Sequence, residues 1–289
     1  MGYNTKIDWW DSSWNPVTGC LHGCEYCYAR RIAERFGGFD SITKINEAAR
    51  ISDKALEAPE LVETWDNLLF ENWSKKDANG RPAKDAKLIR APYPYGFTPT
   101  LHRYRLGIPA RWTKPRTIFV CSMADLFGRW VPVKWIVDVL DACAAAPQHC
   151  YLFLTKNGER YWELDHLGLL PHGTNFWYGT SVNYGLAVSP PLPSENSDLV
   201  KSFCSIEPIH GRVRIGKGAD RPDWVIVGAE TGNRRDKVRP RKEWIDSIVE
   251  QCDASGVPVL MKDSLIPIVG AENMRRDFPW EQEARNEKA

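Results

Sequence analysis

Short runs of apolar residues recur along the second half of the chain, and polar residues follow each of them within a few positions. The runs are continuous rather than alternating, which favours strands that are covered on both faces, as in a parallel sheet. They lie at 117–121, 150–154, 175–178, 202–206, 224–227 and 257–261.

Helical periodicity separates some of these runs. In the stretch 131–143 the apolar residues fall on one face of a helix, with Pro132 near its start. A second amphipathic helix is expected from Glu243 to Ala254, closed by Gly256. Alternating strands and helices favour right-handed βα units, so the pattern predicts an α/β fold. An open doubly wound sheet and a complete or partial barrel both satisfy it.

The pattern breaks down between Phe39 and Trp112, after the first expected helix. We expect an insertion at about 40–112 that forms a lid, although a surface excursion explains its charged part equally well. The charged tail at 275–289 is expected to fray. The chain 1–289 is otherwise expected to form a single domain.

Polar side chains at the ends of the predicted strands indicate an active face. Ligands of βα folds bind at the carboxyl ends of the strands, so these residues predict a ring of side chains around one mouth. A single Ser, Asp or Asn at such a position also suits a helix cap. The candidates are Ser122, Asp125, Lys156, Ser181, Asn183, Glu207, Glu230 and Lys262.

Three cysteines within eight residues, Cys20, Cys24 and Cys27, are the strongest chemical signal. Three thiolates at this spacing can hold a 4Fe–4S cluster and leave its fourth iron open. Together with His22 they can also form a Cys3His zinc site. The residues alone leave both readings open. The other five cysteines lie in or beside apolar segments and are interpreted as core residues.

This motif resembles the signature of the radical S-adenosylmethionine superfamily, in which an aromatic residue precedes the last cysteine. Tyr26 stands at that position, and Glu25 to Phe36 is expected to be the helix that follows the cysteine loop. The segments 11–20, 97–102, 118–127, 153–156, 205–208 and 227–232 also resemble a phage-associated family of three-Cys-motif proteins with no established reaction.

The resemblance implies a partial (β/α) TIM-like barrel that holds a 4Fe–4S cluster through Cys20, Cys24 and Cys27. An external electron donor would reduce the cluster, and cleavage of S-adenosylmethionine would give a 5′-deoxyadenosyl radical. Asn183 stands where the family pattern has an acidic residue. The reaction type and the catalytic residues stay unassigned. The residues implied to bind the cofactor are Tyr26, Ser122, Asp125, Ser181, Asn183, Glu207 and Glu230.

A basic run at 233–242 indicates a nucleobase, a nucleotide or a nucleic acid as substrate, although a solvated loop explains the same run. Lys156, Lys262, His102 and Arg239 are the candidate substrate-binding residues. The alternative function is a zinc-binding protein that interacts with nucleic acid without radical chemistry.

The net charge of +1 and the hydrophobic content of 43% are those of an ordinary globular protein. The sequence has no signal-peptide pattern and no apolar stretch of membrane-spanning length. We therefore expect a cytoplasmic protein that does not bind membranes. Neither a hydrolase nucleophile elbow nor a Walker phosphate loop is present.

Overall fold

The structure is a computed structural model. It describes residues 10–36, 50–51, 62–64, 69–73, 78–79, 84, 88–90, 93, 95–188 and 200–280. The chain divides into two compact units. Unit 1 comprises Met1–Ser12, Pro115–Phe119 and Pro147–Ala289, and unit 2 comprises Ser13–Lys114 and Val120–Ala146.

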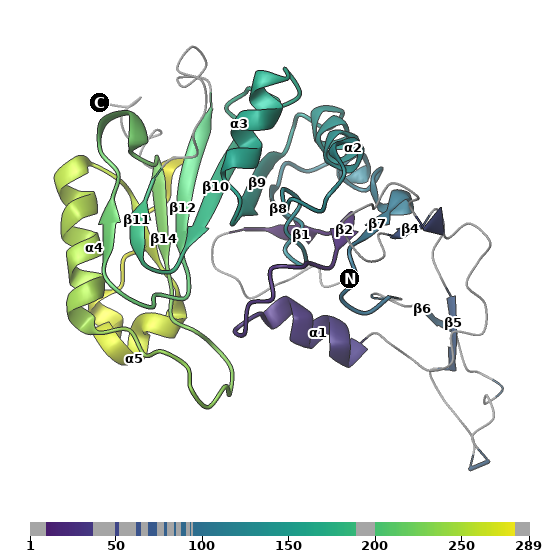
Figure 1. Cartoon of the computed structure of the whole chain (residues 1–289), viewed down its shortest axis with the longest axis horizontal. Helices are drawn as coiled ribbons and strands as arrows, with labels where there is room; N and C mark the ends of the chain where they lie inside the picture. The colour runs from purple at the N-terminus through teal and green to yellow at the C-terminus, as the bar shows by residue number, and fades with distance from the viewer. Residues whose placement is uncertain are drawn as a thin grey trace. The chain divides into compact units, whose positions relative to one another are not determined.

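The main sheet has seven strands in the order β1-β8-β9-β10-β12-β14-β15 (Figure 1). All the pairs that join β8 to β15 are parallel. β1 and β15 are its two edges, so the sheet is open. This confirms the predicted α/β class and is consistent with a partial barrel. The strands are β1 (Ser12–Trp14), β8 (Thr117–Val120), β9 (Cys150–Thr155), β10 (Phe176–Val182), β12 (Lys201–Ile206), β14 (Trp224–Val227) and β15 (Val259–Met261).

Successive residues of a central strand in unit 1 enter two separate apolar clusters, because they point to opposite faces of the sheet. In β14, Trp224 and Ile226 join one cluster, whereas Val225 and Val227 join the other. All four are completely buried. Burial on both faces explains why the strand is apolar at every position.

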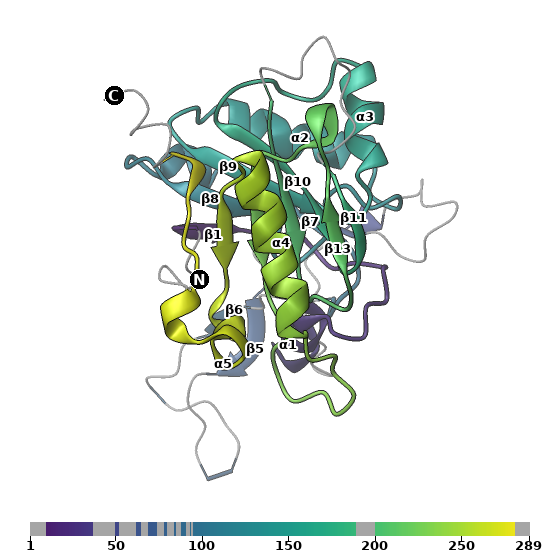
Figure 2. The ribbon, with the colours of Figure 1, turned by 90° about the vertical axis from the view of Figure 1, so that its left-hand side faces the viewer.

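Helix α4 (Lys242–Ser255) covers one face of the sheet in unit 1 (Figure 2). Its buried Ile245, Ile248 and Cys252 belong to the same cluster as Val225. The helix ends at Gly256, whose φ of +65° is left-handed and suits glycine. The predicted helix at 243–254 is therefore confirmed. Unit 1 also contains β11 (Gly185–Ala187), β13 (Val213–Ile215), α3 (Glu159–His166), α5 (Ile266–Val269), η4 (Gly218–Asp220), η5 (Asp263–Leu265) and η6 (Ala271–Asn273).

Aromatic side chains from the segment after β15 cover the opposite face of the sheet in unit 1. The rings of Phe278 and Trp280 lie 6.0 and 5.4 Å from that of Trp224, measured between centroids. We expected the chain to fray from residue 275. Residues 275–280 instead pack on the sheet, and residues 281–289 lie outside the described part of the chain.

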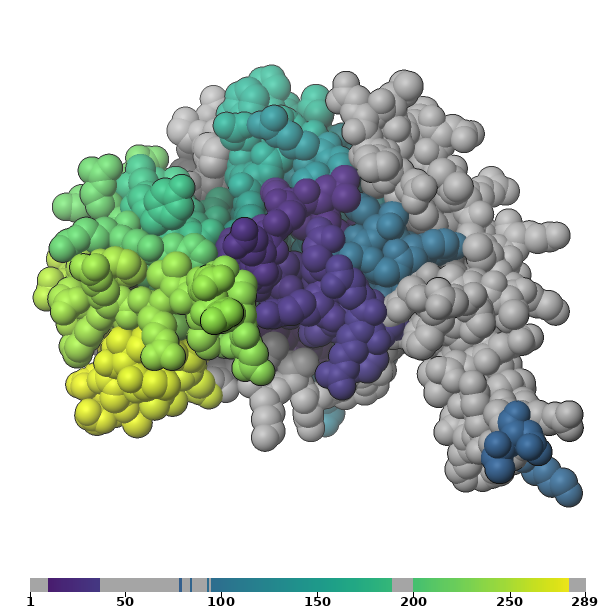
Figure 3. All heavy atoms as spheres, turned by 60° about the horizontal axis from the view of Figure 1, so that its bottom comes forward, coloured from purple at the N-terminus to yellow at the C-terminus, as the bar shows by residue number. Residues whose placement is uncertain are grey.

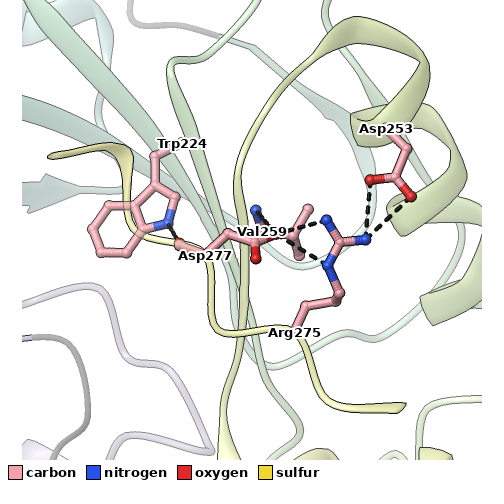
Figure 4. A network of polar contacts seen from close by, with 5 residues as sticks. All are labelled: Trp224, Asp253, Val259, Arg275 and Asp277. Atoms are coloured by element: carbon pink, nitrogen blue, oxygen red, sulfur yellow. Dashed lines mark hydrogen bonds and ion pairs between the residues drawn. The ribbon is translucent and has the colours of Figure 1, made fainter. Parts of the chain in front are cut away.

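Arg275 fastens this segment to the rest of unit 1 (Figure 4). Its guanidinium donates to the carboxylate of Asp277 at 2.6 and 3.0 Å and to that of Asp253 at 3.0 and 3.2 Å. The hydrogen bonds that Arg275 donates to Asp277 and Asp253 raise the pKa of its guanidinium. Trp224 Nε1 donates to the carbonyl oxygen of Asp277 at 3.0 Å, so the aromatic core and the ion-pair network share one residue.

Unit 2 has a four-stranded sheet of order β2-β7-β4-β3 and a two-stranded sheet of β5 and β6. The strands β3 to β7 come from the expected insertion, most of which lies outside the described residues, so a lid there stays a prediction. The elements are β2 (Val17–Thr18), α1 (Tyr28–Phe36), β3 (Arg50–Ile51), β4 (Val62–Thr64), β5 (Leu69–Trp73), β6 (Leu88–Arg90), β7 (Thr100–His102), η1 (Arg103–Arg105), η2 (Pro109–Arg111) and α2 (Val133–Ala144).

None of the helices in the described ranges has the length and apolarity that crossing a bilayer requires.

The network around Asp277 makes a prediction for stability. Replacing Asp277 with Ala removes one of the two carboxylates that accept hydrogen bonds from Arg275, so the free energy of unfolding should fall by about 1–2 kcal/mol in urea denaturation. The control variant Glu250→Ala changes an exposed carboxylate on α4 and should have an effect within about 0.5 kcal/mol. Equal midpoints for the two variants would contradict a stabilising role for this segment.

Candidate functional site

The three cysteines lie in the loop between β2 and α1 of unit 2, which we call the cysteine loop (Gly19–Cys27). All three are free thiols and are partly exposed. Figure 3 shows the segment that contains this loop and α1, in purple, at the surface. Gly19 has a φ of +87°, and a β carbon there would lie 2.3 Å from the carbonyl oxygen of Thr98. The loop therefore requires glycine at its start.

His22 ties the cysteine loop to the segment that follows β8. Its Nε2 lies 2.7 Å from Asp125 Oδ2, and its ring meets Trp130 edge-on with 4.8 Å between centroids. The other carboxylate oxygen of Asp125 accepts the backbone N–H of Phe127 at 3.1 Å. Asp125 is buried, and both of its oxygens have protein partners. It anchors the cysteine loop, a role that the sequence reading did not assign to it.

Ser122 takes part in the same anchoring. Its hydroxyl donates to Asn15 Oδ1 at 3.2 Å, and its carbonyl oxygen accepts the hydroxyl of Tyr28 at 2.6 Å. Asn15 Oδ1 also accepts the backbone N–H of Met123 at 2.9 Å. The segment after β8 and the first residue of α1 are thus joined by hydrogen bonds within unit 2.

Backbone groups donate hydrogen bonds to two of the thiol sulfurs. The N–H of Arg30 lies 3.3 Å from Cys27 Sγ, and the backbone of His22 bonds the sulfur of Cys20. Burial nevertheless raises the pKa of Cys20 to about 12, with smaller increases from Asp125 and the other two loop thiols. A thiolate at Cys20 therefore needs a nearby positive charge, which a bound metal supplies.

The cysteine loop offers suitable donors without holding them in a finished metal geometry. Within the described ranges, no group of three or more His, Cys, Asp or Glu side chains is arranged to hold a metal ion. Thiolate chemistry fits an iron–sulfur cluster or zinc. Tyr26, which stands between Cys24 and Cys27 in the sequence, is partly buried.

Unit 1 brings other candidates to the carboxyl ends of its parallel strands. Lys156, after β9, donates through Nζ to the hydroxyl of Ser181 on β10 at 3.3 Å. Lys262, after β15, forms an ion pair with Glu207, after β12. A β carbon on Gly228 would lie 3.0 Å from Glu207 Oε1, so glycine leaves room for this carboxylate.

A second acidic residue at this edge is also paired. Arg234 donates through Nε and Nη2 to the two carboxylate oxygens of Glu230, at 2.8 Å each. The carboxylate of Glu230 is almost completely buried. Burial lowers the pKa of His210; the charges of Arg234 and Lys156 lower it further, and that of Glu230 raises it. Charged residues that follow β9 and β14 therefore act on the imidazole of His210, which follows β12.

Asn183 connects the loops after β10 and β12. Its side-chain amide donates to the carbonyl oxygen of Pro208, and its own carbonyl oxygen accepts the N–H of His210, both at 2.8 Å. These contacts give Asn183 a structural role at the strand ends. The amide suits that role, which an acidic residue lacking a donor would not fill.

His102 and Arg239 have opposite surroundings. His102, in unit 2, is fully buried and lies 2.9 Å from Thr18 Oγ1 through its Nε2. Its pKa is well below the usual value, first because of burial and second because of Arg105. In this structure a substrate cannot reach its ring. Arg239, in unit 1, is exposed in the loop between β14 and α4.

Comparison with protein families decides the family. The model of a family described as a protein of unknown function, DUF5131, matches residues 4–77 and 71–265. The chain belongs to the DUF5131 family. No curated protein and no solved structure matches this DUF5131 chain. The family description assigns no reaction. The chemistry of the chain therefore rests on two groups of side chains, those of the cysteine loop in unit 2 and those at the strand ends of unit 1.

Sequence reasoning missed three features of these groups. The pairing of His22 with Asp125 joins residues 103 positions apart, and no local pattern announces it. The Glu230–Arg234 pair has an i,i+4 spacing that the sequence does contain. The sequence contains no sign that His210 belongs to this group, other than its position four residues after the end of β12.

The buried His102 predicts how stability depends on pH. Its folded-state pKa lies below the unfolded value of about 6.5, so the unfolded chain binds more protons between the two values. Its contribution is therefore fully present above pH about 6.5 and is lost as the pH falls, by up to about 1.4 kcal/mol per pH unit. In urea denaturation below that pH, His102→Asn should show a smaller slope of stability against pH. Equal slopes would contradict this assignment.

Proposed function

We propose that this protein is a radical S-adenosylmethionine enzyme that holds a 4Fe–4S cluster through Cys20, Cys24 and Cys27. The observation that carries the proposal is the cysteine loop. Its three thiols have the superfamily spacing, its turn at Gly19 requires glycine, and His22 anchors it through a buried carboxylate.

The chemistry of the bound cluster would be one-electron reduction of S-adenosylmethionine, which breaks a sulfonium C–S bond and gives methionine and a 5′-deoxyadenosyl radical. An external donor supplies the electron. The three thiolates would hold three irons of the cluster, and the backbone N–H groups of His22 and Arg30 donate to the sulfurs of Cys20 and Cys27. Such hydrogen bonds stabilise thiolate charge and tune the reduction potential.

The strand-end residues of unit 1 support the binding part of the proposal. Lys262 orients the partly exposed carboxylate of Glu207, which is preorganised to receive an amino or hydroxyl group. The carboxylate of Glu230 is held by Arg234 through both of its oxygens. Ser181 presents a hydroxyl beside Lys156. In unit 1 we assign these groups and Asn183 to binding of cofactor or substrate groups. In unit 2 we assign Ser122 and the backbone of Tyr26 to the cofactor.

The proposed substrate is a nucleobase, a nucleotide or a nucleic acid, from which the radical removes a hydrogen atom. The proposed location is the cytoplasm. All eight cysteines of the chain are free, which suits a reducing compartment and an oxygen-sensitive cluster.

Zinc is the competing occupant, and one observation favours it. A carboxylate that bonds one nitrogen of a histidine commonly orients that histidine toward a zinc ion. The pair of His22 and Asp125 has this arrangement, which leaves Nδ1 of His22 for a metal. A zinc-binding protein that interacts with nucleic acid is therefore the alternative function.

Anaerobic reconstitution separates the two functions. The parent protein should bind about four irons, become brown and produce 5′-deoxyadenosine when dithionite and S-adenosylmethionine are added. Cys24→Ser should reduce both iron content and product to background. Cys150→Ser, at a partly exposed cysteine outside the loop, is the matched control and should retain both.

Two results would sink the radical proposal. One is the absence of both the chromophore and 5′-deoxyadenosine in the reconstituted parent. The other is stoichiometric zinc in protein purified without oxygen, together with loss of that zinc in Cys24→Ser, which would establish the alternative.

Asp125 should act by positioning the cysteine loop. Asp125→Ala removes the partner of His22, so metal affinity should fall by about 10-fold or more, as for other outer-shell carboxylates. The measurement is metal retention against a chelator, and Asp138→Ala, which breaks a pair with Arg103 elsewhere in unit 2, is the control. Equal retention in the two variants would remove Asp125 from this role.

A further inference from the structure

We infer that the carboxyl edge of the sheet in unit 1 binds single-stranded nucleic acid, with Tyr184 stacking on a base and Arg235 and Arg239 contacting phosphates. The inference rests on the proposed function and names its substrate class.

A basic loop, residues 231–241, joins β14 to α4. From Thr231 to Lys242 the sequence contains six Lys or Arg residues and one acidic residue, Asp236. In Figures 1 and 2 this loop, in light green, projects beyond the first residues of α4. It starts just after the end of β14, where ligands of parallel sheets bind.

Several cations of the basic loop have partners that fix its conformation. Arg234 is paired with Glu230 at the sheet edge. Lys237 Nζ donates to the carbonyl oxygen of Gly232 at 3.0 Å, which closes the turn. The guanidinium of Arg241 lies 5.5 Å from the centroid of the Trp244 ring, where the loop enters α4. The loop is therefore shaped by contacts at both of its ends.

Arg235 and Arg239 are different, because both are exposed and the described residues supply neither with an acidic partner. Lys242 shows the contrast, since it pairs with Asp246 at 2.7 Å. An exposed guanidinium without a carboxylate keeps its charge and its five donors for a ligand. Its planar fork matches the oxygens of a phosphate group.

Tyr184 supplies a second feature that points to a nucleic acid. It follows β10 and is 71% exposed, the largest value among the exposed large hydrophobic residues. A β carbon on Gly211 would lie 3.2 Å from the β carbon of Tyr184. The Cβ of Tyr184 is therefore packed against Gly211, while its aromatic ring is exposed to solvent. An aromatic ring presented in this way is a stacking platform for a base.

Tyr184 and the basic loop emerge from the same edge of unit 1. They follow β10 and β14, which flank β12 in the parallel sheet. The N–H of His210, after β12, donates to the carbonyl oxygen of Asn183, next to Tyr184. The pKa of His210 also responds to Glu230 and Arg234, at the start of the basic loop. The three strand ends are thus neighbours.

The combination of two exposed arginines and an exposed tyrosine favours a single-stranded nucleic acid over other polyanions. Two exposed guanidinium groups alone would also attract an acidic peptide or an anionic membrane surface. An exposed aromatic ring beside free cations matches the alternation of base and phosphate in a single strand. In a duplex the bases are already stacked on one another, so the ring would gain little from them.

The phosphate contacts are tested by fluorescence anisotropy of a labelled oligothymidylate at several salt concentrations. Each lost phosphate contact should reduce the slope of log K against log salt by about 0.7, and affinity by about fivefold near 0.1 M salt. Arg235→Ala/Arg239→Ala should reduce the slope by about 1.4 and the affinity by about 25-fold, whereas Arg235→Lys/Arg239→Lys should keep most of the slope. Lys217→Ala, an exposed cation on the amino-terminal side of β14, should match the parent.

The base contact is tested with the same probe. Tyr184→Ala should weaken binding by about tenfold, with an unchanged salt slope because no charge is lost. Tyr184→Phe keeps the ring and should bind like the parent. Trp162→Ala removes another exposed aromatic, on α3, and serves as the matched control.

Four results would overturn the inference: no binding by the parent, an unchanged slope in the double Ala variant, unchanged affinity in Tyr184→Ala, or equal competition by a duplex, a mononucleotide or an acidic peptide. The radical proposal is tested separately by 5′-deoxyadenosine formation in the parent. A parent that forms 5′-deoxyadenosine without binding the oligonucleotide would lose only this inference, and one that binds without forming it would lose only the proposed function.

Discussion

Burial of the central strands of unit 1 on both faces is the constraint on which its other features depend. Trp224 and Val225 are neighbours in sequence but enter different apolar clusters, so every position of β14 is occupied by an apolar side chain. Polar groups are therefore displaced to the strand ends, where water and charged partners stabilise them. Lys156, Glu207 and Glu230 share one edge of the sheet for this reason.

The same constraint explains how much the sequence could predict. Continuous apolar runs revealed the parallel strands, and a 3.6-residue period revealed α4, because both signals are local. The sequence did not predict that Phe278 and Trp280 cover one face of the sheet, because these two aromatic residues lie in a segment rich in charged residues. The sequence predicts His102 as a substrate contact, because the sequence alone does not reveal whether a histidine is buried. In the structure His102 is fully buried.

The candidate site was only partly predictable for a related reason. The spacing of Cys20, Cys24 and Cys27 is a local signal and was read directly. Whether a polar residue faces a ligand or another side chain depends on contacts between distant segments. The sequence predicts Asp125 as a cofactor ligand, but in the structure its two oxygens lie within hydrogen-bonding distance of His22 Nε2 and of the backbone N–H of Phe127. A strand-end residue is thus a candidate ligand only after its protein partners are known.

The late position of Phe278 and Trp280 has a consequence for biosynthesis. The ribosome makes strands β8 to β14 before these two residues, so the face around Trp224 stays uncovered until Phe278 and Trp280 have been made. During that interval the nascent chain exposes tryptophan-rich surface of the kind that chaperones bind, and a stalled or shortened product would keep it exposed.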